Sequence, residues 1–297
     1  MNKFKMICLS VAFLCSSVCT AYTQDNSEKS NVFAEIDNSL KELNIEMVTC
    51  PAGSFLMGSP KSELGRVEPD VNSIWYRPEI SVTETQHKVN LTKDFQIGKY
   101  EVTQKQFKEI MGRNPSEFKD DNFPVTNVTK WDADEFCKNL NEKFEKVLPK
   151  GYKFALPTEA QWEYACRAGT TTALNNNKNL TIADGECSNL DEVAWYRGNT
   201  EGRSVHQVGQ KKPNAWGIYD MHGNVMEICS DAHQNYTEEE LTDPVGTPQT
   251  AFRGFLYKGG DCRSKPEGCR SATRIPFKPR QIYANSYMGM RLAIVAE

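Results

Sequence analysis

Apolar residues recur at helical spacing near the start of the chain, at Val32, Phe33, Ile36, Leu40 and Leu43. This spacing collects apolar side chains on one face, so it predicts a short amphipathic helix. We place this helix in an N-terminal leader, 24–45, that feeds the main domain, 46–297.

Apolar and polar residues alternate instead over 47–58, and Pro51 and Gly53 interrupt the alternation. Alternation is typical of strands with one buried face. We therefore expect a hairpin of two short strands here, and a further strand over 95–102.

Capping boxes predict two helix starts, because Thr103 is followed by Gln106 and Thr158 by Gln161. In this motif each of the two side chains satisfies a backbone N–H group of the other residue. The helices are expected to end near Gly112 and Gly169, since glycine favours the position after a helix. Another helix is predicted over 131–144, with these residues on its inner side: Trp131, Phe136, Leu140 and Phe144.

The second half of the chain is rich in turn residues, with brief strands expected only near 217–219, 255–258 and 288–294. Long structureless loops are unusual in a compact domain, so ions, disulfides or ligands are expected to hold them. The net charge of −4 provides no broad basic surface and argues against nucleic acid as a partner.

Residues 1–23 have the features of a secretory signal peptide: Lys3 and Lys5, an apolar run over 6–18 and small residues at 19–21. The run is too short for an ordinary membrane span, and no second one follows. The mature chain is therefore expected to be exported, to the periplasm, the outer surface or the medium. Lipidation at Cys19 is the alternative, which Val18 disfavours.

Seven cysteines follow the signal peptide, which permits up to three disulfides in an oxidising compartment. They are Cys50, Cys137, Cys166, Cys187, Cys229, Cys262 and Cys269.

Seven short motifs in a fixed order resemble the sulfatase-modifying factor family, to which the formylglycine-generating enzymes belong. They are Met47–Gly58, Ile97–Thr103, Leu156–Gly169, Gly217–Glu227, Gly259-Gly260, Cys269–Arg274 and Gly289–Arg291. The resemblance implies an α+β fold of the C-type-lectin-like kind, rich in loops, with a few helices and short antiparallel strands.

A structural calcium ion is implied by the resemblance of 217–227. The expected ligands are the side chains of Asp220 and Glu227 and the carbonyls of Gly223 and Val225, a set of oxygen donors that suits calcium. The alternative is a turn and a strand in which Glu227 is buried against an arginine such as Arg291. A second family calcium site would fall at 189–190, but its acidic ligands do not align.

The resemblance also implies a disulfide between Cys166 and Cys269, although Cys269 lies two residues before the family position, which Ser271 occupies. Cys137 is expected to be a buried free thiol, because its family partner position holds Leu292. A pair of Cys187 with Cys262 is a further hypothesis.

Catalysis in the family uses two cysteines, five residues apart, that bind copper. Two thiolates suit Cu(I). The first position here is Ser264 and the second is Cys269, while Cys262 lies two residues too early. Tryptophans that often flank Glu227 in relatives are replaced by Met226 and Ile228.

We therefore expect a binding or structural module that has lost catalysis. Its unknown protein or small-molecule partner would bind a loop face formed by 185–210, 229–255 and 261–285. Exposed residues expected there are Arg263, Lys265, Arg280 and Tyr283. The alternative is a copper- and oxygen-dependent oxidase that converts a sulfatase cysteine to formylglycine, with Cys269 and Cys262 as catalytic residues. His206, His222 and His233 are not expected to bind iron, and His222 is expected to be exposed.

Overall fold

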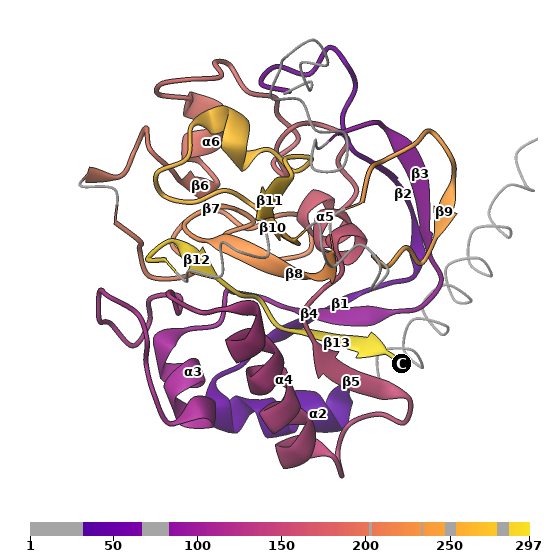
Figure 1. Ribbon diagram of the computed structural model, residues 1–297, viewed down its shortest axis with the longest axis vertical. Helices are drawn as coiled ribbons and strands as arrows, with labels where there is room; N and C mark the ends of the chain where they lie inside the picture. The colour runs from indigo at the N-terminus through magenta and orange to yellow at the C-terminus, as the bar shows by residue number, and fades with distance from the viewer. Residues whose placement is uncertain (1–31, 67–82, 202–203, 233, 247–253, 278–284) are drawn as a thin grey trace, which may run out of the picture.

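The computed structural model describes residues 32–66, 83–201, 204–232, 234–246, 254–277 and 285–297. Helices α2 (Ala34–Leu40), α3 (Gln104–Met111) and α4 (Lys130–Phe144) lie together at one end, whereas α5 (Glu159–Arg167) and α6 (Ser188–Asp191) lie among the loops and the four small sheets (Figure 1). This arrangement confirms the expected loop-rich α+β class. None of the helices in these ranges has the length and hydropathy that a bilayer crossing needs.

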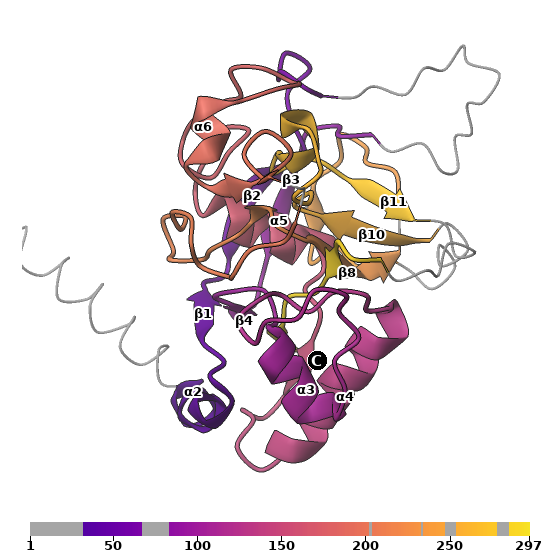
Figure 2. The same cartoon turned by 90° about the vertical axis from the view of Figure 1, so that its left-hand side faces the viewer.

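The first sheet lies next to the helices. Its strands are antiparallel and follow the order β1 (Met47–Cys50), β4 (Phe95–Gly98), β13 (Ala293–Ala296) and β5 (Tyr152–Ala155). The elements around its apolar face are α2 (Ala34–Leu40), the 3₁₀ turn η1 (Lys41–Leu43), α3 (Gln104–Met111) and α4 (Lys130–Phe144) (Figure 2). The fully buried Ile36, Leu40, Phe107, Phe136 and Ile294 belong to this core.

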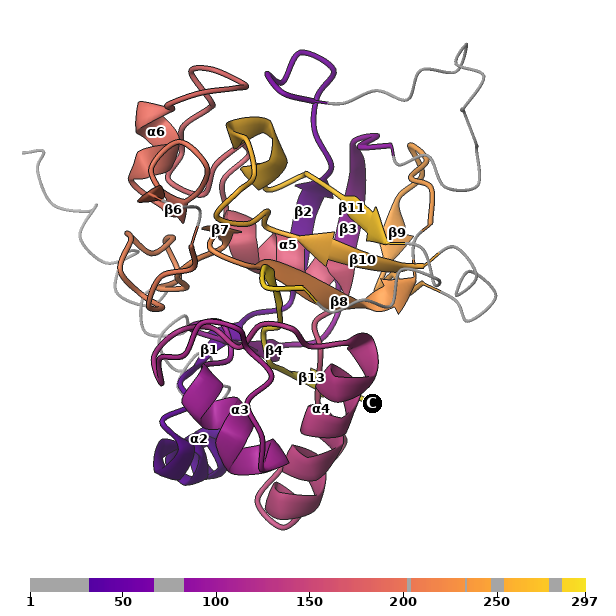
Figure 3. The same ribbon diagram turned by 60° about the vertical axis from the view of Figure 1, so that its left-hand side comes forward.

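The second sheet has the order β11 (Ile275–Phe277), β10 (Phe255–Lys258), β8 (Met226–Ala232) and β12 (Met288–Gly289). Helix α5 (Glu159–Arg167) packs beside β8 and β10 (Figure 3). The remaining elements are β2 (Gly53–Met57), β3 (His87–Leu91) and β9 (Leu241–Thr242) in one sheet, β6 (Ala194–Trp195) with β7 (His222–Gly223) in another, and the short helices α6 (Ser188–Asp191) and η4 (Pro266–Cys269).

Both predicted capping boxes are present. The Thr103 hydroxyl accepts from the backbone N–H of Gln106, whose side chain accepts in return, and Thr158 and Gln161 repeat the arrangement. Helix α4 begins with the same device, built from Thr129 and Asp132. The expectation for Trp131 was wrong: it is 57% exposed, because it lies in the first turn of α4, outside the packed face.

The predicted hairpin over 47–58 is also wrong. Both strands exist, but β1 pairs with β4, and β2 pairs with β3 in a different sheet. The strand expected near 217–219 is absent, because a turn closed by the Gly217 N–H and the Asn214 carbonyl occupies this position.

The outer side of β5 is closed by a side chain. Asn141 of α4 donates its amide N–H to the Phe154 carbonyl at 2.9 Å and accepts the Phe154 N–H at 2.7 Å. These are the bonds that a neighbouring strand would make, so Asn141 prevents strand addition at this edge.

Candidate functional site

The predicted calcium segment lies at the start of β8, where Glu227 is buried among hydrogen-bond donors. Arg291 donates to its carboxylate at 2.6, 2.8 and 3.0 Å, and the indole N–H of Trp162 donates at 2.6 Å. These contacts match the alternative interpretation of Glu227, in which an arginine pairs with it.

Two further carboxylates lie close to this pair. Asp220 accepts the Gly209 N–H at 2.6 Å, and Glu101 accepts from the Asn224 side chain at 2.7 Å and from the Val225 N–H at 3.2 Å. Burial raises the pKa of Asp220 to about 6. Burial, together with the charges of Asp220 and Glu227, raises the pKa of Glu101 well above its usual value.

This cluster fits a cation only in part. Glu101, Asp220 and Glu227 are buried around one guanidinium, so their ionised forms leave an excess of negative charge that a divalent ion would neutralise. The oxygens of Glu227, however, are already occupied by Arg291 and Trp162. Among the described residues, no group of three or more His, Cys, Asp or Glu side chains is placed to hold a metal.

The predicted disulfide between Cys166 and Cys269 does not form. All seven cysteines of the described residues are buried free thiols, so Cys187 and Cys262 are not bonded to each other either. Cys166 Sγ lies 3.5 Å from the Ser271 hydroxyl, and His222 occupies the space between Cys166 and the Cys269 backbone. Cys137 is a buried free thiol, as expected.

His222 is fully buried, which corrects the expectation that it is exposed. Its Nδ1 lies 2.6 Å from the Cys269 carbonyl, and its Nε2 lies 3.0 Å from the Asn175 N–H. The carbonyl needs a donor and the N–H needs an acceptor, so the ring is neutral with its proton on Nδ1. Burial lowers the pKa of His222 to about 4.

Ser264 occupies the first copper position of the family. Ser264 donates its hydroxyl to Asp261 at 3.1 Å and accepts the Asp261 N–H at 3.0 Å. Cys262 packs with Val205 and Val225, whereas Cys269 belongs to a separate apolar cluster. Burial raises the pKa of Cys262 to about 12, and raises that of Cys269 well above its usual value.

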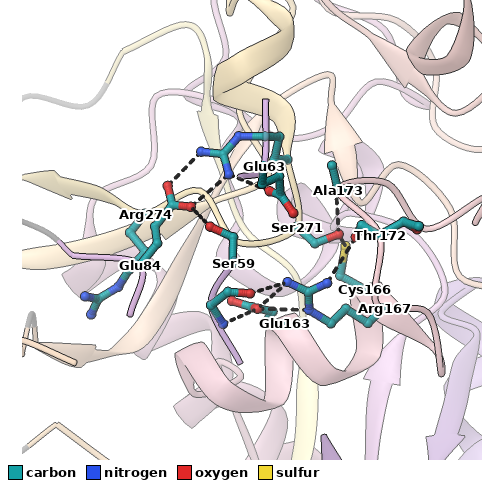
Figure 4. Close-up of polar contacts among 12 residues, drawn as sticks. Ser59, Glu63, Glu84, Glu163, Cys166, Arg167, Thr172, Ala173, Ser271 and Arg274 are labelled. Atoms are coloured by element: carbon teal, nitrogen blue, oxygen red, sulfur yellow. Dashed lines mark hydrogen bonds and ion pairs between the residues drawn. The ribbon is translucent and has the colours of Figure 1, made fainter. Parts of the chain in front are cut away.

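A chain of buried ion pairs was not predicted. Arg270 pairs with Glu63 and Glu84 at 2.7 Å each. Glu84 also accepts the Ser59 hydroxyl at 2.6 Å (Figure 4). On α5, Glu163 pairs with Arg167, one helical turn further along, at 2.9 Å. Glu163 also pairs with the fully buried Lys258 at 3.0 Å. Arg274 pairs with Glu159 at 2.6 Å. The sequence signal was a pair of arginines, Arg270 and Arg274, with no acidic residue between them.

The loop face carries a charged hollow of about 250 Å³ between 184–186, 197–198 and 265–266. Lys265 pairs with Asp184 at 2.9 Å on its rim, and Arg197 and Glu186 add one charge of each sign. Arg263 lies 4.3 Å from the ring centre of Tyr287. Arg280, Tyr283 and His233 lie outside the described residues, as does the segment 1–23. His206 stacks on Trp195 with ring centres 3.8 Å apart.

Comparisons with known proteins agree with the motifs. The family model described as a sulfatase-modifying factor enzyme 1-like domain matches residues 32–296. The chaperone protein LppX of Paenibacillus barcinonensis is 35% identical over 210 residues, which cover 56% of this chain and 69% of that protein. The formylglycine-generating enzyme of Mus musculus is 29% identical over 180 residues, which cover 58% of this chain and only 44% of the enzyme.

Solved structures share the fold. The Treponema denticola variable protein 1 superposes with a TM-score of 0.66 at 26% identity, covering 84% of this chain and 94% of that one. PvdO from Pseudomonas aeruginosa superposes with a TM-score of 0.60 at 24% identity, covering 84% and 93%, a similarity that concerns the fold alone.

Proposed function

The chain belongs to the family of sulfatase-modifying factor enzyme 1-like domains, and from this premise we propose that it is an exported binding module without formylglycine-generating activity. A fold alone does not determine activity, so the proposal depends on the chemistry of individual residues.

One observation carries the proposal: the first copper-cysteine position of the family is Ser264, whose hydroxyl is engaged with Asp261. The backbone of the displaced Cys262 is held in place, since its N–H donates to the Asn224 carbonyl at 3.0 Å and its carbonyl accepts from the Thr200 hydroxyl at 2.7 Å. A hard hydroxyl oxygen is a poor ligand for Cu(I), which prefers thiolates.

The binding site we propose is the hollow on the loop face. Its two cations and two carboxylates suit a polar partner that presents both charges, such as a segment of another protein. The similarity to a relative named a chaperone supports a protein partner. Loops presented by a rigid scaffold commonly carry recognition.

The second candidate is the oxidase of the family, which the similarity to formylglycine-generating enzymes supports. A Cu(I) titration combined with a sulfatase peptide that contains the substrate cysteine separates the two functions. We expect no stoichiometric copper binding and an unchanged peptide thiol. Copper bound at one equivalent, lost in Cys269→Ser, together with loss of the peptide thiol, would establish the oxidase instead.

A structural calcium ion remains a proposal for the same fold, with Asp220 and the carbonyls of Gly223 and Val225 as ligands. Asp220 is the better side-chain candidate, because the carboxylate of Glu227 is taken by Arg291 and Trp162.

A further inference from the structure

Two hollows meet at the end of β5, on a part of the molecule distinct from the loop face. One, of about 540 Å³, lies between α4, β5 and Ser230 of β8. The other, of about 490 Å³, lies between β5, the end of β13 and the loop 243–245. Both are lined by Ala155, Leu156 and Ser230, so they form one groove that passes over the end of the strand.

The floor of this groove is apolar. Phe154 and Leu156 form it in the first hollow, and Leu91, Phe95 and Val295 contribute in the second. Val245 lies at the margin of the second hollow and is 59% exposed, the highest value among the large hydrophobic side chains of the described residues. Leu91, Phe95, Phe154 and Leu156 are each at most 5% exposed, so an apolar side chain seated here would mainly remove Val245 from water.

The rim of the groove is acidic. Its lining includes six carboxylate residues, which outnumber three lysines. Three of the carboxylates lie on α4 or at its C-cap: Asp134, Glu142 and Glu145. Asp134 pairs with Lys130 and Glu142 with Lys138, but Glu145 forms no ion pair with any described residue. The unbalanced charge favours a cationic partner.

The backbone at this edge cannot accept a new strand. Asn141 occupies both polar groups of Phe154, and the Ser230 N–H donates to the Pro157 carbonyl at 2.9 Å. A partner must therefore bind through its side chains. Alternate side chains of an extended chain lie on one face about 7 Å apart, so two of them can enter the two adjoining hollows.

We propose that this groove binds an extended, basic polypeptide segment, with one bulky apolar side chain in each hollow and lysine or arginine toward the carboxylates of α4. The proposal goes beyond the loop face and does not depend on the function assigned to it.

The test uses two fluorescent heptapeptides, one alternating leucine with lysine and the other alternating leucine with glutamate. We expect the lysine peptide to bind at least about tenfold more tightly at 0.15 M salt. Amide chemical shifts in the ¹⁵N-labelled full chain should change around 153–156 and 243–245. Val245→Glu should weaken binding about tenfold, and E142K/E145K should reverse the preference between the peptides. The matched control, Glu186→Lys on the loop face, should change neither.

These substitutions are at the surface, and a retained melting temperature confirms that each variant is folded. Equal binding of both peptides, or shifts confined to other regions, would overturn the proposal. A concentration-dependent dimer that Val245→Glu dissociates would identify a second copy of the chain as the occupant, and would also overturn it.

Discussion

Arg291 connects Glu227 at the start of β8 to the first sheet. Its guanidinium contacts the Glu227 carboxylate three times and also donates to the Gly98 carbonyl at the end of β4, at 2.8 Å. Both side chains are almost completely buried. The pair therefore joins the first sheet to the second.

Replacing Arg291 by Met should lower the free energy of unfolding by about 3–5 kcal/mol, because the buried carboxylate of Glu227 loses its counter-charge. Urea denaturation measures this loss. E227Q/R291M should recover part of it, since the uncompensated charge is then absent. A loss below about 1 kcal/mol for Arg291→Met alone would show that water or a cation replaces the guanidinium.

Removal of calcium tests Asp220 as a ligand. A ligand present at about 100 times its Kd stabilises by about 2.7 kcal/mol, which corresponds to about 5–10 °C in Tm for a domain of this size. Stripping with a chelator should lower Tm by this amount, and Asp220→Asn should abolish the response. Asp184→Asn, an exposed carboxylate, should respond like the parent chain. Identical melting curves for stripped and calcium-loaded protein would contradict the site.

His222 should make the fold sensitive to acid. Its pKa is about 4 in the native state against 6.5 for an ordinary histidine, so the unfolded state binds more protons within that window. Stability is thus complete above pH 6.5 and falls by up to about 3 kcal/mol as the pH drops through 4. His222→Asn keeps an N–H donor for the Cys269 carbonyl and should flatten this slope in urea titrations between pH 4 and 7. An unchanged slope would assign the acid response to other groups.

Asn141→Ala should leave the Phe154 N–H and carbonyl without protein partners at the sheet edge. The expected cost is about 1–3 kcal/mol, measured by chemical denaturation. Lys138→Ala, on the same helix and exposed, serves as the control and should change stability by less than about 0.5 kcal/mol. Hydrogen exchange at Phe154 should accelerate selectively in Asn141→Ala. If it does not, β13 alone protects this strand.

Features that depend on residues close together in the sequence, such as helix starts, were predicted correctly. Thr103 and Thr158 start helices because each needs only a side chain three residues ahead, and that relationship is visible in any window. The pairing of strands could not be predicted, because alternation indicates that a residue is in a strand but not which strand lies beside it. For this reason β1 and β2 were paired with each other instead of with β4 and β3.

The candidate site shows the same limit, since contacts between distant segments could not be predicted from the sequence. The resemblance implied calcium at Glu227, and the alternative to it named Arg291 as the partner; these two side chains are in contact. His222 was misjudged because its two partners come from Asn175 and Cys269, in segments 47 residues away on either side. The Cys166–Cys269 pairing was inferred from family position, yet the fold places Ser271 against Cys166.

The place of β13 governs how the chain can acquire its shape. It lies between β4 and β5, although it is synthesised after both of them. Until the ribosome has added residues 293–296, β4 and β5 have no strand between them, and the helices cannot complete their core. The first sheet can therefore close only after residues 293–296 have been added, so its assembly depends on contacts between distant parts of the chain.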